Sequence, residues 1–411
     1  MCKKIVSYVF VAIVGMVLSG ALHSQEIFSL NRNSDWEWEE EFDRGRRATF
    51  DLRYNRVEGI YTGLRVKRYE SYYGFSNKPF IYGFTGYSFG SNDFEYLLGL
   101  EKGFFEDYHI AFGGEYHRMI DTEDRWIIPD LENSLAAFFL KEDFQDFYFR
   151  EGGSFYISQN FTKRFNLTAA YRYEELDSLA KSVNWALFAG KSKDFRENPA
   201  MDAGTVRSIT ANFTIDSRNS RSAPYRGWYI QFEYEHAGGD LGGDFSFDRV
   251  LMDIRRYQPI GFNEGLDFRL RIGTANGYLP WHKSFHLGGL STLRGFKYKE
   301  FPNGPMNRGG NRMLLAQIEY RMGEQDLPDE LDWGLLELFN LIIFIDSGWV
   351  GDTDSGYGLL KGFGALSWKN LKTDVGIALA NRSGSVRFEV ARRTDTGKKP
   401  FRFLFRITRP F

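Results

Sequence analysis

Gly288-Gly289-Leu290-Ser291-Thr292-Leu293-Arg294-Gly295-Phe296 places one cation between glycines and apolar residues. A second stretch, Phe344-Ile345-Asp346-Ser347-Gly348, carries a carboxylate, and one segment of alternating apolar and polar residues, Met313–Met322, separates the two. A cation and a carboxylate in a confined, partly dried space favour each other far more than two exposed charges do. Finding both halves in this order, with one expected strand between them, is the most specific signal in the sequence.

The two stretches are similar to paired motifs of one protein family. Leu293-Arg294-Gly295-Phe296 resembles the tip of the inward-folded sixth loop in the BamA-type outer-membrane assembly-factor and transporter superfamily, which is also called the bacterial surface antigen superfamily. Phe344–Gly348 resembles its F-x-D-x-G strand motif. The resemblance covers nearly the whole mature chain and is strongest from about Val206 onward. It implies that Arg294 reaches through the barrel lumen to Asp346.

Strand alternation extends this expectation to neighbouring residues. On Met313–Met322, Gln317, Glu319 and Arg321 should face the lumen, so Glu319 is a second candidate to receive Arg294. Phe344, Asp346 and Gly348 should share the inner face of the next strand. Gly295 allows a sharp turn, Gly348 leaves room for the loop, and Phe296 is expected to pack with Phe344. The contact is either an internal brace or a mechanistic latch.

The N-terminus predicts export. Lys3 and Lys4 precede an apolar run from Ile5 to Leu18, which is typical of a signal peptide and too short for a stop-transfer helix. We expect a signal peptide at 1–24, a short acidic periplasmic lead-in at 25–53 and a barrel at 54–411. The only cysteine, Cys2, lies in the signal, so the mature chain has no disulfide framework and no cysteine metal site. The lead-in is too short for the periplasmic POTRA domains that most members of the family carry, so we expect a barrel-only branch.

Composition favours a membrane β-barrel. Aromatic residues make up 17% of the chain, with 39 Phe and 23 Tyr, and there are 43 Gly. Aromatic girdles, glycine-containing turns and a polar lumen require such a mixture. Beyond the signal no apolar stretch of about eighteen residues occurs, so we expect no transmembrane helix. The formal net charge of −2 is no signature of nucleic-acid binding.

Period-two alternation predicts an all-β transmembrane antiparallel barrel of about sixteen strands, with the Arg294 loop after the eleventh, on the extracellular side. The expected strands are Gly59–Arg68, Phe80–Tyr87, Phe94–Glu101, His109–His117, Gly153–Phe161, Phe165–Glu174, Val183–Ala189, Val206–Asp216, Trp228–His236, Val250–Tyr257, Leu266–Ala275, Met313–Met322, Leu338–Gly348, Leu371–Ala380, Ser385–Arg393 and Pro400–Phe411.

One segment has helical periodicity instead. Leu131–Leu140 has apolar residues three and four apart, which predicts a short amphipathic helix. The strand count places it between the fourth and fifth strands, on the periplasmic side, and a count that is off by one moves it outside. It either plugs or braces the barrel rim, or it is a docking face for a partner.

A turn near the middle of the chain resembles the family's D-x-R-D…P-x-x-G periplasmic turn. It contains Asp216, Arg218, Pro224 and Gly227, and Asn219 stands where the family has aspartate. Asp and Asn bond to their own backbone in tight turns, proline fixes φ and glycine frees it. We expect a structural turn rather than a contact site.

The C-terminus resembles the signal by which outer-membrane barrels are recognised for insertion. Phe401, Phe403, Phe405 and Ile407 alternate outward, and the chain stops at Phe411. Pro410 cannot donate to a strand ladder and so suits an edge. The resemblance implies that polypeptides are handled at the seam between the first and last strands, with Tyr54–Gly59 as the matching edge.

Signals for enzymes and for metal or cofactor binding are missing. The chain has neither H-E-x-x-H nor G-x-S-x-G, and His109, His117, His236, His282 and His286 lack metal-ligand spacing. The glycine-rich stretch 238–244 has no strand-to-helix context and is expected to be a hairpin loop. We expect no enzyme, metal or cofactor, although a lipase built from a few rim residues stays an alternative.

The resemblance implies insertion or translocation of polypeptides, and in some branches of lipid, at the bacterial outer membrane. The expected partners are outer-membrane lipid, an unfolded polypeptide client, and a separate periplasmic protein or lipoprotein that supplies client capture. The alternative is a passive pore or structural barrel that kept the fold and lost the activity, since fold alone does not decide function.

Overall fold

A computed structural model describes residues 48–68, 77–190, 192–261, 264–302, 308–323, 339–353, 358–395 and 400–411. The expected signal peptide and residues 25–47 of the expected lead-in lie outside the described residues.

Within the described residues, sixteen strands form one antiparallel sheet in which each strand pairs with the next along the chain. This confirms the expected strand number. The strands are β1 (Thr49–Asn55), β2 (Gly59–Val66), β3 (Phe80–Ser88), β4 (Asp93–Phe104), β5 (Ile110–Asp121), β6 (Tyr148–Thr162), β7 (Phe165–Ser178), β8 (Gly204–Asp216), β9 (Gly227–Ala237), β10 (Ser246–Pro259), β11 (Gly265–Tyr278), β12 (Arg312–Met322), β13 (Phe339–Gly351), β14 (Lys372–Asn381), β15 (Arg387–Arg393) and β16 (Arg402–Arg406).

The helices occupy the connections. In the described ranges they are the α-helix α3 (Asp130–Leu140) and the 3-10 turns η3 (Glu106–Tyr108), η4 (Asp124–Trp126), η5 (Gly239–Leu241), η6 (Trp281–Lys283) and η10 (Phe363–Ala365). None of the helices in the described part of the chain is both long and apolar enough to cross a membrane. The stretch 238–244 is the loop between β9 and β10, as expected.

The two faces of the sheet differ in the way that alternation predicts. On β13, Ile343 is 45% exposed and Ile345 is 39% exposed. The residues that alternate with them, Phe344 and Asp346, are buried. Arg269 on β11 is also buried on the inner face. Charged side chains are therefore enclosed while apolar ones point outward, which is the arrangement of a barrel in lipid.

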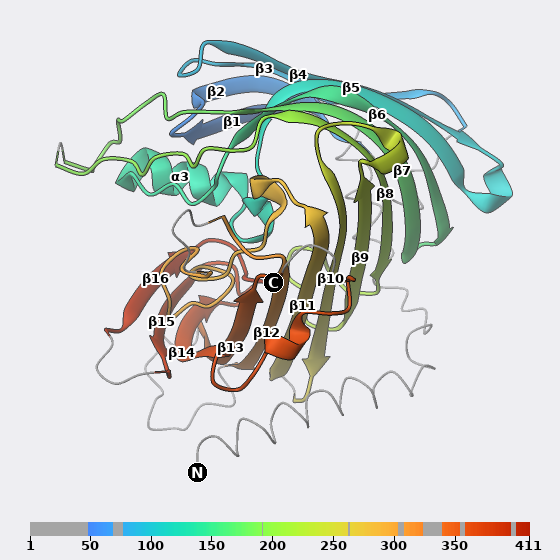
Figure 1. The fold of residues 1–411 in the computed structure, drawn as a ribbon. Coiled ribbons are helices and arrows are strands. Elements are labelled where there is room, and N and C mark those ends of the chain that lie inside the picture. Colours follow the sequence, from blue (N-terminus) through green and yellow to red (C-terminus); the bar gives the residue numbers. More distant parts are fainter. Residues whose placement is uncertain are drawn as a thin grey trace.

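The sheet curls so that β1 and β16 approach each other, and α3 lies between them (Figure 1). Because neighbouring strands are antiparallel, every connection that follows an odd-numbered strand lies at the same end of the barrel, which we call the loop end. The connections β5–β6, β7–β8 and β11–β12 all belong to it. The connection between β11 and β12 contains Arg294, so the inward loop follows the eleventh strand, as predicted.

Two expectations about the first strands are wrong. Val183–Ala189 is not a strand: Leu187 and Phe188 donate their N–H groups to Phe138 and Phe139 of α3 instead of to a strand. The first strand begins at Thr49, five residues before the expected start of the barrel at Tyr54. One false strand and one missed strand cancel, and for this reason the total and the loop position were still predicted correctly.

The expected helix is present, but its position differs from the prediction. It follows β5, at the loop end, rather than lying between the fourth and fifth strands on the opposite side. The missed β1 explains the shift by one strand. The helix ends at Lys141, whose left-handed backbone lets its N–H reach the carbonyls of Ala136 and Ala137.

The last strand is shorter than predicted. Strand β16 ends at Arg406, and residues 407–411 leave the sheet. Phe411 is buried, so it does not continue the outward row of Phe403 and Phe405. The tail bends inward because Arg409 donates to Asp267 on the inner face of β11, with a nitrogen–oxygen distance of 2.8 Å.

Candidate functional site: a luminal charge cluster and the strand seam

The connection between β11 and β12 forms a stiff arm. Its two limbs pair through Leu287 and Phe301, whose backbone groups exchange hydrogen bonds of 3.1 and 2.9 Å. Gly288 has φ of +130°, and a Cβ there would lie 2.3 Å from the carbonyl oxygen of Lys297. Only glycine fits this crossing. The arm therefore holds its tip, which carries Arg294, in one position.

Arg294 is completely buried at the tip of the arm. Its Nε and Nη2 donate to the two carboxylate oxygens of Asp346 at 2.7 and 2.8 Å. Its Nη1 donates to Glu319 at 2.6 Å and to Glu389 at 3.3 Å. The ring of Phe344 lies 3.4 Å below the guanidinium carbon. The predicted contact with Asp346 is present, and Glu319 joins it.

A second arginine completes this cluster. Arg387 on β15 donates to Glu319 at 2.9 Å, and its Nε lies 2.8 Å from Glu389. We call Arg294, Arg387 and the three carboxylates the luminal cluster. Its members come from the arm and from β12, β13 and β15. Bidentate arginine–carboxylate contacts fix geometry as well as charge, so the cluster ties the arm to three strands of the wall.

Next to the luminal cluster, the arm and the barrel wall approach each other closely at two glycines. A Cβ at Gly295 would lie 2.6 Å from the Cβ of Asp374 on β14, and one at Gly348 would lie 2.8 Å from a methyl group of Leu287. Both glycines therefore make room for the arm, which is the role predicted for Gly348. Gly295 also lies in the predicted turn, in which the N–H of Phe296 donates to the carbonyl of Leu293 at 3.0 Å.

The packing of Phe296 differs from the prediction. Its ring packs against Phe301, with a centroid distance of 5.3 Å, and the guanidinium of Arg393 lies over it at 4.1 Å. Phe344 packs under Arg294 instead. The electron-rich face of that ring is taken by the cation, because a desolvated cation–π contact is favourable.

At the seam, α3 contacts β1. The backbone N–H of Tyr54 donates to Ser134 at 3.1 Å, and its ring packs edge-on against Phe138 at 5.5 Å. The Tyr54 hydroxyl donates to the carbonyl of Trp185 at 2.6 Å. The end of β1 is thus bonded to the helix and to the β7–β8 connection.

The same helix contacts β16 through charged groups. Glu132 accepts from Arg406, the last residue of β16, and from Thr408 in the tail. Both side chains of the ion pair are almost completely buried. Thus α3 bridges the first and last strands in the place where strand pairing would otherwise close the barrel.

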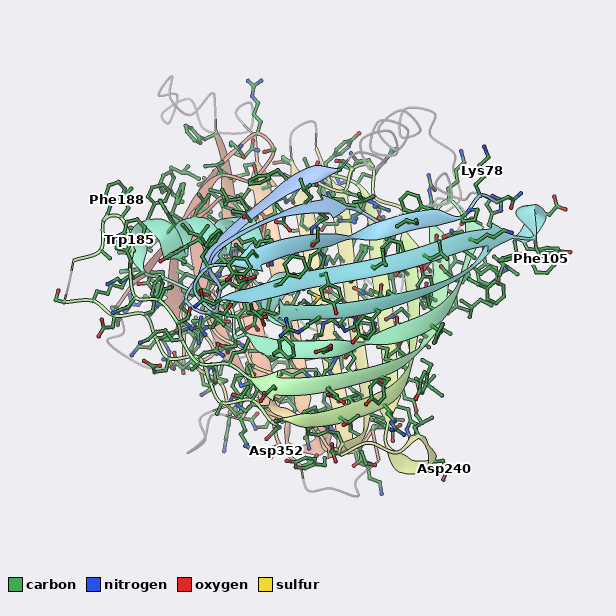
Figure 2. The ribbon with its side chains drawn as sticks, turned by 90° about the horizontal axis from the view of Figure 1, so that it is seen from above. Lys78, Phe105, Trp185, Phe188, Asp240 and Asp352 are labelled. Carbon is green, nitrogen blue, oxygen red and sulfur yellow. The ribbon has the colours of Figure 1, made fainter. Side chains whose placement is uncertain are left out.

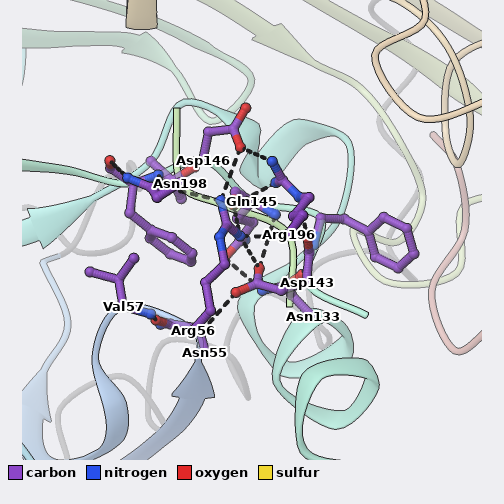
Figure 3. A network of polar contacts seen from close by, with 12 residues as sticks. Asn55, Arg56, Val57, Asn133, Asp143, Gln145, Asp146, Arg196 and Asn198 are labelled. Atoms are coloured by element: carbon purple, nitrogen blue, oxygen red, sulfur yellow. Dashed lines mark hydrogen bonds and ion pairs between the residues drawn. The ribbon is translucent and has the colours of Figure 1, made fainter. Parts of the chain in front are cut away.

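Arg56, in the turn between β1 and β2, binds the loop-end connections together (Figure 3). Its guanidinium donates to the carbonyl of Gln145 at 2.6 Å, to Asn198 at 2.8 Å and to Asp146 at 3.1 Å. Its backbone N–H donates to Asp143 at 2.9 Å. The turn that follows β1 is therefore fixed to the segment after α3 and to the β7–β8 connection.

Lys299 links this network to the arm. It lies 2.7 Å from both Asp124 and Asp146. Burial alone would raise the pKa of Asp146, but Lys299, Arg196 and Arg56 hold it below its usual range. Burial raises the pKa of Asp124, which Lys299 opposes. The arm and the α3 connection are thus joined by a buried ionic contact.

Residues 122–411, most of the chain, match the Omp85 superfamily domain. The chain belongs to the Omp85 superfamily. It is 25% identical over 316 residues to the outer membrane protein assembly factor BamA of Nitratidesulfovibrio vulgaris (strain Hildenborough), covering 72% of this chain and 36% of that protein. It therefore spans about a third of the length of this curated relative. The family predicted from the two motifs is confirmed.

Structural comparison agrees on the fold. The crystal structure of BamA from Haemophilus ducreyi lacking POTRA domains 1–3 matches with a TM-score of 0.55 at 14% identity, covering 87% of this chain and 70% of that chain. As an Omp85 protein, the chain is an integral β-barrel of the bacterial outer membrane, in a superfamily of assembly factors and transporters.

In this Omp85 chain the predicted turn after β8 is present. Asp216 accepts two hydrogen bonds from the guanidinium of Arg218, at 2.9 and 2.8 Å. Gly227 has φ of +116°, and the carbonyl of Pro224 accepts from Arg409 of the tail at 2.6 Å. The turn and the C-terminal tail therefore meet at the barrel end opposite the loop end.

Sequence reasoning missed several residues of this site. Arg387 and Glu389 lie at inward-facing positions of a predicted strand. Charged residues at such positions could have indicated that they belong to the luminal cluster. The partners of Arg56, Glu132 and Arg406 come from distant connections, and no spacing in the sequence relates them.

Proposed function

We propose that this chain inserts or translocates polypeptides at the outer membrane and that the seam between β1 and β16 receives them. One observation carries the proposal. Within the described residues, β1 pairs only with β2, and β16 pairs only with β15. In hydrocarbon each unsatisfied backbone N–H or C=O group costs several kcal/mol, so a free strand edge favours the addition of another strand.

The client would bind by strand addition. An extended segment gains main-chain hydrogen bonds from the free edge of β16, while its alternate side chains pack beside Phe403 and Phe405. The luminal cluster supports this role because Glu389 lies on β15, the neighbour of β16. The arm thereby stiffens the wall to which the acceptor strand is attached.

The proposal includes no catalytic step and no cofactor. The free energy would come from backbone pairing and apolar burial of the client. Delivery of an unfolded client to the barrel is assigned to a separate periplasmic protein or lipoprotein.

Site-specific photocrosslinking tests the seam. A benzoylphenylalanine replaces Leu52 on β1 or Phe405 on β16, and the matched control position is Phe232 on β9, whose side chain is also outward. We expect adducts with newly synthesised outer-membrane polypeptides at the two seam positions and none at Phe232. Equal adducts at all three positions, or none at the seam, would contradict the proposal.

Outer-membrane proteomics after depletion of the protein defines the breadth of the role. Loss of many barrels indicates general assembly, and loss of one or two proteins indicates a dedicated transporter. An unchanged profile together with stable conductance of the purified protein would favour the passive pore.

A further inference from the structure

A groove of about 680 Å³ lies between α3 and β16. Phe139 and Leu140 of α3 form one wall, Phe403 and Phe405 of β16 form the other, and Leu290 of the arm lies at its inner side. Its volume is in the range of sites that bind small molecules, roughly 300–1,000 Å³. Its walls are mainly apolar, so an apolar ligand would be favoured.

The groove opens on the lipid-facing surface. Phe403 is 79% exposed and Phe405 is 56% exposed on the outward row of β16. Phe188, which also lines the groove, is 72% exposed and stacks on Phe139. Phe188 and Trp185 lie beside α3 at the margin of the molecule (Figure 2). In the membrane these side chains contact hydrocarbon, so acyl chains reach the groove directly.

Three charged residues line the groove, and two of them are compensated. Glu132 is paired with Arg406, and Glu142 is paired with Lys193. The side chain of Arg402 has no hydrogen-bond or ion-pair partner among the described residues. A cation beside an apolar wall without a counter-charge is unfavourable. The groove thus combines an apolar interior with one cation that has no anionic partner in the described part of the chain.

The cation stands at the end of the groove where a lipid headgroup would lie. Arg402 is the first residue of β16, at the loop end, and Ile407 follows the other end of the strand. A lipid with its headgroup at that membrane surface would direct its chain from Arg402 toward Ile407, along the apolar wall. Arginine binds phosphate through two parallel N–H donors.

We propose that the groove between α3 and β16 binds an acyl chain of a phosphate-bearing membrane lipid and that Arg402 binds its phosphate. The lipid would occupy the seam in the resting barrel, in contact with both the helix and the last strand. This site is additional to the strand-acceptor role proposed above and does not depend on it.

A polypeptide strand fits the groove less well than a lipid does. The helix satisfies its own backbone hydrogen bonds and so offers no edge to a strand. Strand β16 forms the opposite wall. Glu132 of α3 contacts Arg406 and Thr408 there and so covers one end of the β16 edge. A lipid needs no backbone partner, and its phosphate compensates Arg402, for which the described residues offer no anion and which a strand of ordinary composition leaves uncompensated.

Photolabelling of the full chain in phosphatidylcholine nanodiscs tests the site. The probe is phosphatidic acid with a diazirine on one acyl chain, compared with the matching diacylglycerol, which lacks the phosphate. We expect labelling by phosphatidic acid to map to Leu140, Phe188 and Phe405. Arg402→Gln should reduce it roughly tenfold, to the diacylglycerol level, because it removes a charge-assisted contact.

Two variants serve as controls. Arg392→Gln removes an exposed arginine of the neighbouring strand that does not line the groove, and should leave labelling unchanged. Ala136→Trp fills the groove and should abolish labelling by both probes. Heat-modifiable migration on gels verifies that each variant is folded, and the Arg402 comparison stands without the tryptophan variant.

Equal labelling of the native chain and Arg402→Gln would overturn the proposal. A client peptide that carries the same diazirine provides a second test. If it labels these groove residues and the lipid probe does not, the occupant is a polypeptide and the proposal is overturned. Labelling spread evenly over the outward face, with no enrichment at the groove, would also overturn it.

Discussion

Arg294 and Asp346 form a two-point contact, in which Nε and Nη2 of the guanidinium lie 2.7 and 2.8 Å from the two carboxylate oxygens. Both side chains are completely buried. One belongs to a loop and the other to β13, so the contact joins a connection to the barrel wall. Lysine could not replace this arginine, because only a guanidinium offers two parallel donors.

Arg294→Ala is expected to lower the free energy of unfolding by about 3–5 kcal/mol, because it leaves buried carboxylates without their cation. Urea titration of the purified barrel, followed by heat-modifiable migration on gels, measures this. Arg118→Ala is the matched control: it breaks a 2.6 Å ion pair with Asp93 that is partly exposed. That loss should stay below about 1 kcal/mol. Similar losses in the two variants would refute the structural importance of the cluster.

Asp346→Ala should destabilise the barrel by a similar amount, and the double variant should cost less than the sum of the two single changes, because the two residues share one network. Client insertion measured in proteoliposomes should fall in all three variants. Wild-type stability and activity in both single variants would exclude a latch.

Gly295→Ala is expected to displace the arm. Its Cβ would lie 2.6 Å from the Cβ of Asp374 and 2.9 Å from the backbone nitrogen of Arg393, which belong to strands that cannot easily move. Overpacking of this kind typically costs about 1–3 kcal/mol. Gly364→Ala is the control, because a Cβ there meets nothing within 4 Å. Urea unfolding compares the two, and equal midpoints would show that the tip has room to adjust.

The fold was predictable from sequence where alternation is strong. From β8 onward each expected strand overlaps an observed one, because lipid-facing and luminal residues must alternate in a barrel wall. Val183–Ala189 misled the prediction because its apolar residues pack on α3 rather than in the sheet. β1 was missed although Phe50 and Leu52 alternate with charged residues, because it directly follows the acidic lead-in.

The site was predictable only in part. Arg294 and Asp346 could be paired because each lies in a recognisable motif. The seam contacts could not be predicted, since Glu132 and Arg406 lie far apart in the sequence and only the curled sheet brings them together. Helical periodicity predicted that α3 exists, but the prediction of its location depended on the strand count.

Glu132→Ala is expected to release α3 from β16, because it leaves the guanidinium of Arg406 buried without a carboxylate. A cysteine at Ala137, which is buried in the native barrel, reports the release through its reaction with a maleimide. Loss of a buried ion pair should raise that rate by more than roughly tenfold. Glu142→Ala is the control, since its ion pair with Lys193 is exposed. An unchanged rate in the Glu132 variant would mean that other contacts hold the helix.

Acid is expected to destabilise the barrel through His282 in the arm. Burial, together with Lys283, lowers the pKa of His282 to about 4, whereas a histidine in an unfolded chain titrates near about 6.5. Between these values the unfolded chain binds a proton that the folded one does not. The free energy of unfolding should therefore be highest above pH ~6.5 and fall by about 3 kcal/mol as the pH is lowered to ~4.

Urea titrations across that pH range measure how steeply the free energy of unfolding changes with pH, in the native chain and in two variants. His282→Gln removes the titrating group and should flatten the slope contributed by this residue. His236→Gln removes a histidine whose side chain is 42% exposed and is the matched control for the loss of an imidazole. If His282→Gln keeps the full slope, the acid sensitivity arises elsewhere, and the buried carboxylates that contact Lys299 become the groups to substitute next.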